Sequence, residues 1–132
     1  MVIYLDFDGT VVEHAFPQIG APNPCCFEVL RKLQAAGHSI ILNSVRCNIG
    51  GHCLREAFTY LKASNLVEPV TESVPEKIHP PDWDLAKSKS SGNLFIDDVA
   101  GKIPLRDTVV IRDSKMVDWE EVGRQLKRSG FY

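Results

Sequence analysis

The sequence lacks the features of a membrane protein and of a secreted one. No apolar run approaches the roughly 20 residues that a helix needs to cross a membrane. The first residues lead straight into a short apolar segment, without the basic stretch and longer apolar stretch of a secretory leader. We therefore expect a cytoplasmic protein that does not bind a membrane.

A strong excess of charge of one sign is also missing. Lysine and arginine number 15 against 17 aspartates and glutamates, which leaves a formal net charge of -2, and both signs are mixed along the chain. Such a chain has no long-range field that would attract a polyanion. Nucleic acid is therefore disfavoured as a partner, and any acidic ligand has to be bound by local groups.

Cysteine pairs with the spacing of a zinc site or a redox motif are absent too. Cys25 and Cys26 are adjacent, and five residues separate Cys47 from Cys53. Neither arrangement is the CxxC spacing that such sites use. We expect all four cysteines to be reduced and packed as small hydrophobic side chains.

What the sequence does contain is an alternation of strand-like and helix-like segments. Strands are predicted at 2–5, 39–44, 67–74, 93–96 and 108–111, and helices at 24–36, 51–64 and 118–128. The segment 76–92, with adjacent prolines and a run of serines and lysines, is predicted as a loop. Alternation of this kind is typical of a parallel sheet covered by helices. With 132 residues, 44% of them hydrophobic, we predict a single α/β domain over residues 1–132.

Two carboxylates end the first predicted strand. Asp6 and Asp8 follow the apolar run 2–5, and Gly9 and Thr10 come next. In an extended chain these two carboxylates point to the same side, so their charges repel unless a cation lies between them. Open α/β sheets bind ligands beyond the carboxyl ends of their strands, and Mg²⁺ prefers carboxylate and phosphate oxygens. The sequence therefore predicts a magnesium site at this point.

The segment Asp6-Phe7-Asp8-Gly9-Thr10 resembles the DxDGT signature of the haloacid dehalogenase (HAD) superfamily, most of whose members are phosphatases. Two later strand ends strengthen the resemblance. Segment 38–44 is apolar and ends in the hydroxyl of Ser44, similar to the family's second motif. Segment 93–98 ends in Asp97-Asp98, similar to its fourth motif. The resemblance implies a three-layer, Rossmann-like α/β fold with a central parallel sheet.

The same resemblance implies roles for the acidic residues. Asp6 would be the nucleophile that forms an aspartyl-phosphate. Asp8 would protonate the leaving oxygen and then activate water, as general acid and base. Mg²⁺ would be bound by Asp6, Asp97 and Asp98 together with the backbone carbonyl of Asp8. Which of Asp97 and Asp98 binds the metal directly stays open.

Phosphate contacts are expected from three further side chains. Ser44 would donate its hydroxyl to a phosphoryl oxygen, and Arg46 would reach the substrate; the alternatives are a helix N-cap and a solvated charge. The family also uses a lysine upstream of the acidic pair. Lys77, Lys87 and Lys89 all qualify, and Lys87 is favoured because capless relatives often carry this lysine near the acidic strand.

The segment 11–23 takes the place of the family's mobile flap. It is too short to fold as a cap domain with its own core, so we expect a capless protein with an open site. A bulky substrate, or a second subunit of a homo-oligomer, would then cover the site. The predicted function is magnesium-dependent hydrolysis of a phosphomonoester on a small molecule or a polymer end. The alternative is a catalytically weak HAD-like domain that serves as a binding or regulatory module.

Overall fold

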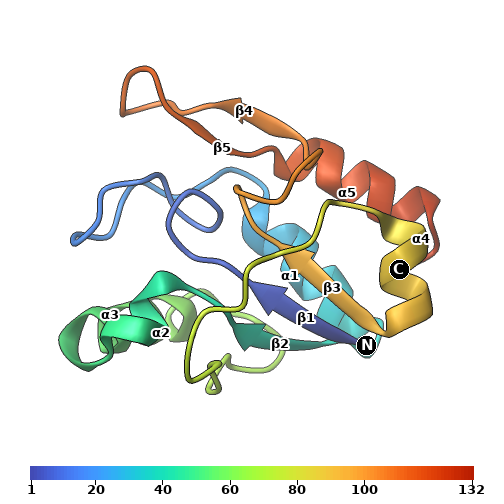
Figure 1. Cartoon of the computed structure of the whole chain (residues 1–132), viewed down its shortest axis with the longest axis horizontal. Helices are drawn as coiled ribbons and strands as arrows, with labels where there is room; N and C mark the ends of the chain where they lie inside the picture. The colour runs from blue at the N-terminus through green and yellow to red at the C-terminus, as the bar shows by residue number, and fades with distance from the viewer.

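Three parallel strands form the centre of the computed structural model, which describes every residue from Met1 to Tyr132. The middle strand β1 (Val2–Leu5) pairs with β2 (Ser39–Leu42) on one side and with β3 (Asn93–Ile96) on the other. Ile3 and Leu5 are completely buried, as expected for a strand covered on both faces. Because the strands are parallel, their carboxyl ends meet at one edge of the sheet (Figure 1).

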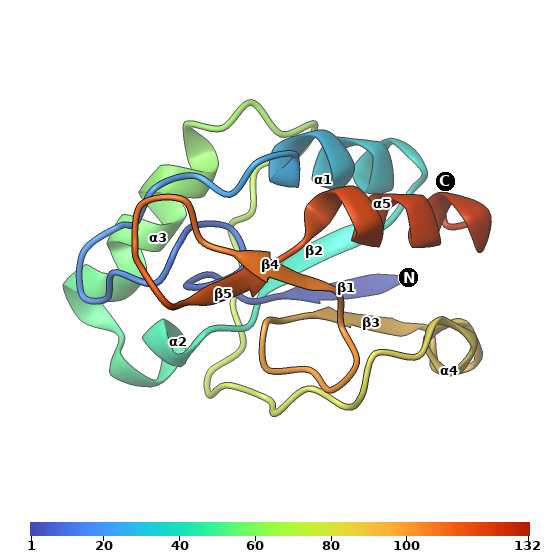
Figure 2. The ribbon, with the colours of Figure 1, turned by 90° about the horizontal axis from the view of Figure 1, so that it is seen from above.

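Two amphipathic helices, α1 (Cys26–Ala35) and α5 (Trp119–Arg128), pack against each other beside the sheet (Figures 1 and 2). Each buries one apolar stripe, represented by Leu30 and Leu33 in α1 and by Leu126 in α5. The side chain of Asp118 caps α5 by accepting the N–H of Glu121. All four cysteines are free thiols, and no helix is long and apolar enough to span a membrane.

The remaining helices lie at opposite ends of the sheet. The short helix α2 (Val45–Ile49) and α3 (Gly51–Lys62) follow β2 at the carboxyl edge. Helix α4 (Leu85–Ser91) precedes β3 and therefore lies near the amino edge. Figures 1 and 2 both show α4 at the end of the molecule opposite to α2.

A separate antiparallel hairpin, formed by β4 (Leu105–Asp107) and β5 (Lys115–Val117), lies above the carboxyl edge (Figure 1). Val117 donates its N–H to the carbonyl of Gly9 at 3.0 Å, which ties the hairpin to the loop after β1. The carboxylate of Glu13 accepts the N–H groups of Val109, Val110 and Ile111 at the tip of the hairpin.

The predicted α/β class, the central parallel sheet and the absence of a cap domain are confirmed. Residues 11–23 form no helix or strand of their own, and Val12 bridges to Asp8 and to Pro22. This segment, called the flap below, therefore folds back onto the loop that follows β1.

Three predicted elements are wrong. Segment 67–74 contains no strand, only a single bridge from Ser73 to Leu42. Segment 76–92 is not all loop: Asp84 caps α4, and Gly92 ends that helix with a left-handed φ of 78°. Segment 108–111 is the turn of the hairpin rather than a strand, because Glu13 binds the N–H groups that strand pairing would need.

Candidate functional site

Three carboxylates from two strand ends lie together at the carboxyl edge of the sheet. Asp6 follows β1, and Asp97 and Asp98 follow the neighbouring strand β3. One oxygen from each carboxylate lies within 4.8 Å of the others. Parallel pairing of β1 with β3 thus joins two acidic motifs that are far apart in the sequence.

The electrostatics of this carboxylate cluster are unusual. Burial, followed by the nearby Asp97 charge, raises the pKa of Asp6 well above its usual value. Burial also raises the pKa of Asp97. Burial opposes ionisation of Asp98 as well, but the hydrogen bond and charge of His14, together with hydrogen bonds to the neighbouring carboxyl groups, outweigh it and lower the pKa of Asp98. A cation at the cluster would offset the repulsion and favour the ionised forms of Asp6 and Asp97.

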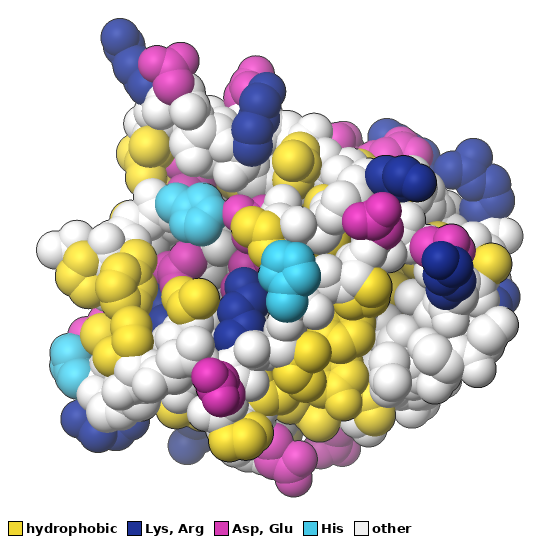
Figure 3. Space-filling model, viewed as in Figure 1, with side chains coloured by type: hydrophobic (Ala, Val, Ile, Leu, Met, Phe, Trp, Pro, Cys, Tyr) yellow, Lys and Arg dark blue, Asp and Glu magenta, His cyan; other side chains and the backbone are white.

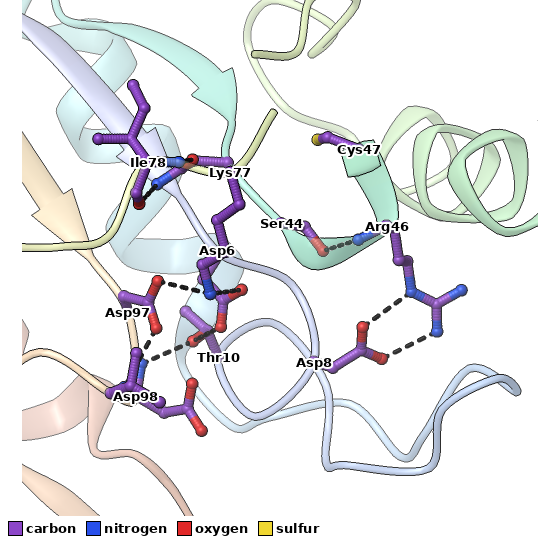
Figure 4. Close-up of polar contacts among 12 residues, drawn as sticks. Asp6, Asp8, Thr10, Ser44, Arg46, Cys47, Lys77, Ile78, Asp97 and Asp98 are labelled. Atoms are coloured by element: carbon purple, nitrogen blue, oxygen red, sulfur yellow. Dashed lines mark hydrogen bonds and ion pairs between the residues drawn. The ribbon is translucent and has the colours of Figure 1, made fainter. Parts of the chain in front are cut away.

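Lys77 contributes a positive charge to the cluster. Its Nζ lies 3.3 Å from Asp6 Oδ1 and 3.1 Å from Asp97 Oδ2, and Figure 4 shows it between the two carboxylates. Burial opposes the charge of Lys77, but the neighbouring Asp6 and Asp97 outweigh it and raise the pKa of the ammonium. Lys77 is therefore a fixed cation beside Asp6.

Two asparagines hold the loop that carries Lys77. Asn43, directly after β2, accepts the N–H of Ile78 at 2.8 Å and donates to the Ile78 carbonyl at 2.9 Å. Asn48 accepts the N–H of Lys77 at 2.6 Å. Sequence reasoning missed both asparagines, because a side chain that binds a distant loop leaves no local pattern. Asn43, the last residue before Ser44, had only its place at a strand end as a signal.

The choice of Lys87 as the lysine of the site is corrected by this geometry. Lys87 lies on α4, where its backbone N–H donates to the capping side chain of Asp84. A helix that leads into β3 joins the amino end of that strand, whereas Asp97 follows its carboxyl end. Lys89 lies on the same helix, and its Nζ contacts the carbonyl of Ser129. Of the three lysines, the structure brings only Lys77 to the carboxylates.

Thr10 and His14, which both follow Asp8 in the sequence, form hydrogen bonds with the carboxylate cluster. Thr10 donates its hydroxyl to Asp6 Oδ2 at 2.9 Å and accepts the N–H of Asp98 at 3.2 Å. His14, from the flap, lies 2.7 Å from Asp98 Oδ2 through its Nε2, and this hydrogen bond raises the pKa of His14. A Cβ at Gly9 would collide with both the His14 ring and the Asp98 carboxylate, so the close approach requires glycine there.

Asp8 does not join the carboxylate cluster. Both of its carboxylate oxygens accept hydrogen bonds from Arg46, from Nε and from Nη2, each at 2.8 Å (Figure 4). The same guanidinium donates to the flap carbonyls of Pro17 at 3.4 Å and Gln18 at 3.0 Å. Arg46 was predicted to contact substrate or solvent, but it is completely buried and binds Asp8 instead.

Ser44 takes the predicted role of a helix N-cap. Its Oγ accepts the N–H of Arg46 at 3.1 Å and so caps α2. The Ser44 hydroxyl hydrogen donates to no group of the protein, and the residue is completely buried. Ser44 follows β2, so it stands at the same sheet edge as Asp6 and Asp97.

The donor set suits a hard divalent cation. Asp97 Oδ2 is buried and accepts no hydrogen bond, because its contact with Lys77 is an ion pair without hydrogen-bond geometry. The backbone carbonyl of Asp8 also accepts no hydrogen bond. Asp6, Asp97, Asp98 and this carbonyl offer oxygen atoms only, which is the ligand type that Mg²⁺ prefers. Two of the predicted metal-binding groups thus have unused acceptor capacity.

The cluster is not enclosed in a deep cavity. Cavities of about 290 to about 490 Å³ occur elsewhere on the surface, mainly along α1, α3 and α4, and none is lined by Asp6, Asp97 or Asp98. Figure 3 shows acidic and basic side chains in a recess of the surface.

Comparison with known proteins identifies a structural relative without a stated activity. No family model matches the chain, and no curated protein matches it. A solved structure, described as that of a conserved protein coded by a locus from Bacteroides thetaiotaomicron, is similar at a TM-score of 0.63 and 27% sequence identity. The match covers 97% of this chain and 90% of that one. The chain thus shares its α/β fold with that protein over nearly its whole length.

Proposed function

We propose that the protein is a magnesium-dependent phosphohydrolase that cleaves a phosphomonoester through an aspartyl-phosphate on Asp6. The position of the Lys77 ammonium, between Asp6 and Asp97, carries this proposal. A fixed cation beside a buried carboxylate would hold a phosphoryl group near the nucleophile. The resemblance of residues 6–10 to the HAD signature supports the same chemistry.

The residues divide the reaction between them. A carboxylate oxygen of Asp6 attacks phosphorus, and the bond from phosphorus to the leaving oxygen breaks. Lys77 and the Ser44 hydroxyl hold the phosphoryl oxygens. Asp6, Asp97 and Asp98 would hold Mg²⁺, which would neutralise the charge of these oxygens. Water then hydrolyses the acyl phosphate and regenerates Asp6.

Asp8 is the proposed acid and base of both steps. It would give a proton to the leaving oxygen and later take one from the attacking water. In the present arrangement both Asp8 oxygens are bound by Arg46, so this role requires the Asp8–Arg46 pair to open. Because Arg46 also donates to flap carbonyls, movement of the flap would weaken its hold on Asp8.

The Asp8–Arg46 pair also favours a second candidate function. A protein whose acid and base is permanently bound would keep the metal and phosphate site but turn over slowly. Such a protein would serve as a binding or regulatory module for phosphorylated ligands.

Turnover and trapping distinguish the candidates. A panel of phosphomonoesters is incubated with Mg²⁺, with Ca²⁺ and after chelation, and acyl phosphate is reduced with borohydride before peptide mass mapping. The enzyme proposal expects hydrolysis with Mg²⁺ only and reduction at Asp6. Hydrolysis that survives chelation, or a modified Asp8 or cysteine, contradicts it. Binding of Mg²⁺ and phosphate without turnover supports the module.

A further inference from the structure

Exposed apolar side chains occur on the loops around the candidate site. Nine large hydrophobic residues of the chain are exposed, and six of them follow site residues in the sequence or lie in the flap or at the tip of the hairpin. We call these six the apolar collar: Phe16, Val45, Ile78, Val99, Val109 and Val110. Figure 3 shows hydrophobic side chains bordering the recess in which acidic and basic side chains are visible.

Three collar residues are direct neighbours of residues that carry the site. Val45 follows Ser44, and Ile78 follows Lys77. Val99 follows Asp98 and donates its N–H to Asp97 Oδ1 at 3.1 Å. The loops that position the phosphate and metal groups therefore also carry these apolar side chains.

The other three collar residues come from the flap and the hairpin. Phe16 lies in the flap, and its ring centroid is 5.0 Å from Arg46 Cζ. Val109 and Val110 lie at the tip of the hairpin, where both N–H groups donate to Glu13 at 3.1 Å. Glu13 precedes the residue that binds Asp98, so the hairpin tip is held against the same flap.

Packing does not require this exposure. The collar side chains are 41% to 70% exposed, so most of their apolar surface contributes nothing to the core. Apolar patches that border a polar recess mark binding surfaces, because a ligand that covers them removes that area from water. At the centre, Lys77 and a metal held by the carboxylates complement a dianionic phosphoryl group.

We propose that the apolar collar binds the hydrophobic body of the substrate, which makes the preferred substrate a phosphomonoester of an alkyl or aromatic alcohol rather than of a sugar. The inference rests on the proposed function, since it places the phosphoryl group at Asp6 and Lys77. The collar then provides apolar contacts with the substrate that the open carboxylate site lacks.

A homologous series of alkyl phosphates tests the collar. Ethyl, butyl and hexyl phosphate share one phosphoryl group and similar leaving alcohols, so only apolar contact changes along the series. We expect kcat/KM with Mg²⁺ to rise by up to about fourfold for each added methylene that the collar buries. Glycerol phosphate, of similar size to butyl phosphate, should be a poorer substrate than butyl phosphate.

Surface variants locate the effect. The double variant Val109→Ser and Val110→Ser removes exposed methyl groups but keeps the backbone N–H groups that bind Glu13. It should flatten the dependence of kcat/KM on chain length. Val67→Ser is the matched control, since Val67 is 56% exposed and lies outside the collar.

Binding of alkyl phosphonates, which are not hydrolysed, keeps the proposal testable if turnover is absent. Calorimetry with ethyl to hexyl phosphonate and Mg²⁺ should show the same gain in affinity per methylene. If the protein shows no turnover but its affinity for phosphonates rises with chain length, only the proposed hydrolysis is refuted. The collar is refuted if the affinity does not depend on chain length, if the Val67 variant loses this dependence as much as the double variant does, or if no phosphonate binds. Sedimentation of a wild-type dimer that the double variant dissociates would assign the collar to a second copy of the chain and also overturn the proposal.

Discussion

Asp6 and Asp8 stand two residues apart after the same strand, and both are buried beside a cation, but the two cations hold them differently. Lys77 places one ammonium between Asp6 and Asp97. Arg46 spans both oxygens of Asp8 with a planar fork. An ammonium is a point charge, whereas a guanidinium donates to both oxygens of a carboxylate at once.

The two cations leave different acceptor capacity at the two carboxylates. On the Asp6 side, the buried Asp97 Oδ2 accepts no hydrogen bond and has only the Lys77 ammonium as a partner, so an oxygen atom remains for a metal ion. On the Asp8 side, Arg46 Cζ lies over the rings of Phe7 and Phe16, at 5.1 and 5.0 Å from their centroids. Asp8 is therefore coupled to the flap, and Asp6 is coupled to the sheet edge.

Exchanging either carboxylate for an amide should have the largest effect on catalysis. Asp6→Asn should lower kcat by about 10⁴-fold or more, because no nucleophile remains. Asp8→Asn should lower kcat by about 10² to 10⁴-fold, because the group that transfers protons is lost along with one carboxylate oxygen that Arg46 binds. Steady-state kinetics with Mg²⁺ and borohydride trapping measure both effects. A larger loss in Asp8→Asn than in Asp6→Asn would reverse the assigned roles.

Removing the cation of the Asp6 side gives the next largest effect. Lys77→Met should lower kcat/KM by about 10² to 10³-fold, because a preorganised charge that faces the phosphoryl group is lost. Lys87→Met is the matched control, since Lys87 lies on α4 at the other end of the sheet. Parallel kinetic assays of both variants decide the matter. Equal losses in the two would remove Lys77 from the site.

The sequence was sufficient to predict the groups that stand at strand ends. The apolar strand at 2–5, the acidic residues Asp6 and Asp97, and the sheet that brings them together follow from local pattern and parallel pairing. The helix α4 was missed because its stability depends on the caps Asp84 and Gly92 rather than on an apolar stripe, and none of its residues is buried.

The side chains that bind across the fold could not be predicted in the same way. Lys77 comes from a loop whose position depends on Asn43 and Asn48, and no spacing in the sequence reports such long-range hydrogen bonds. The Asp8–Arg46 pair likewise joins the end of β1 to α2 through side chains alone. Residue type alone made Arg46 a candidate for substrate and could not reveal that it is buried.

Replacing the guanidinium of Arg46 by an ammonium tests whether its contact with both oxygens of Asp8 stabilises the fold. Arg46→Lys keeps the charge but cannot span both oxygens of Asp8 while donating to the flap carbonyls. We expect a loss of about 2 to 3 kcal/mol in the free energy of unfolding, measured by urea denaturation. Arg124→Lys, which changes an exposed ion pair with Glu121, is the control and should cost less than about 0.5 kcal/mol. If Arg46→Lys left the free energy of unfolding unchanged, the guanidinium fork would not be what holds the flap.

Glu13 is held by a third kind of partner, and its substitution should have the smallest effect on the free energy of unfolding. Its buried carboxylate is held by backbone N–H groups rather than by a cation: although burial opposes it, the amides of Ile111, Val110 and Val109 lower the pKa of Glu13 below its ordinary 4.5. A lowered pKa in the folded state means that the ionised form stabilises the fold above pH 4.5 and that this stability is lost as the pH falls through the lowered pKa. Glu13→Gln should therefore cost about 1.5 kcal/mol at pH 7, and the difference from wild type should shrink below pH 4.5. Urea denaturation across this range measures the difference, with the exposed Glu72→Gln as the control. A cost that stays constant with pH would mean that the charge of Glu13 does not stabilise the hairpin, and that its shape alone does.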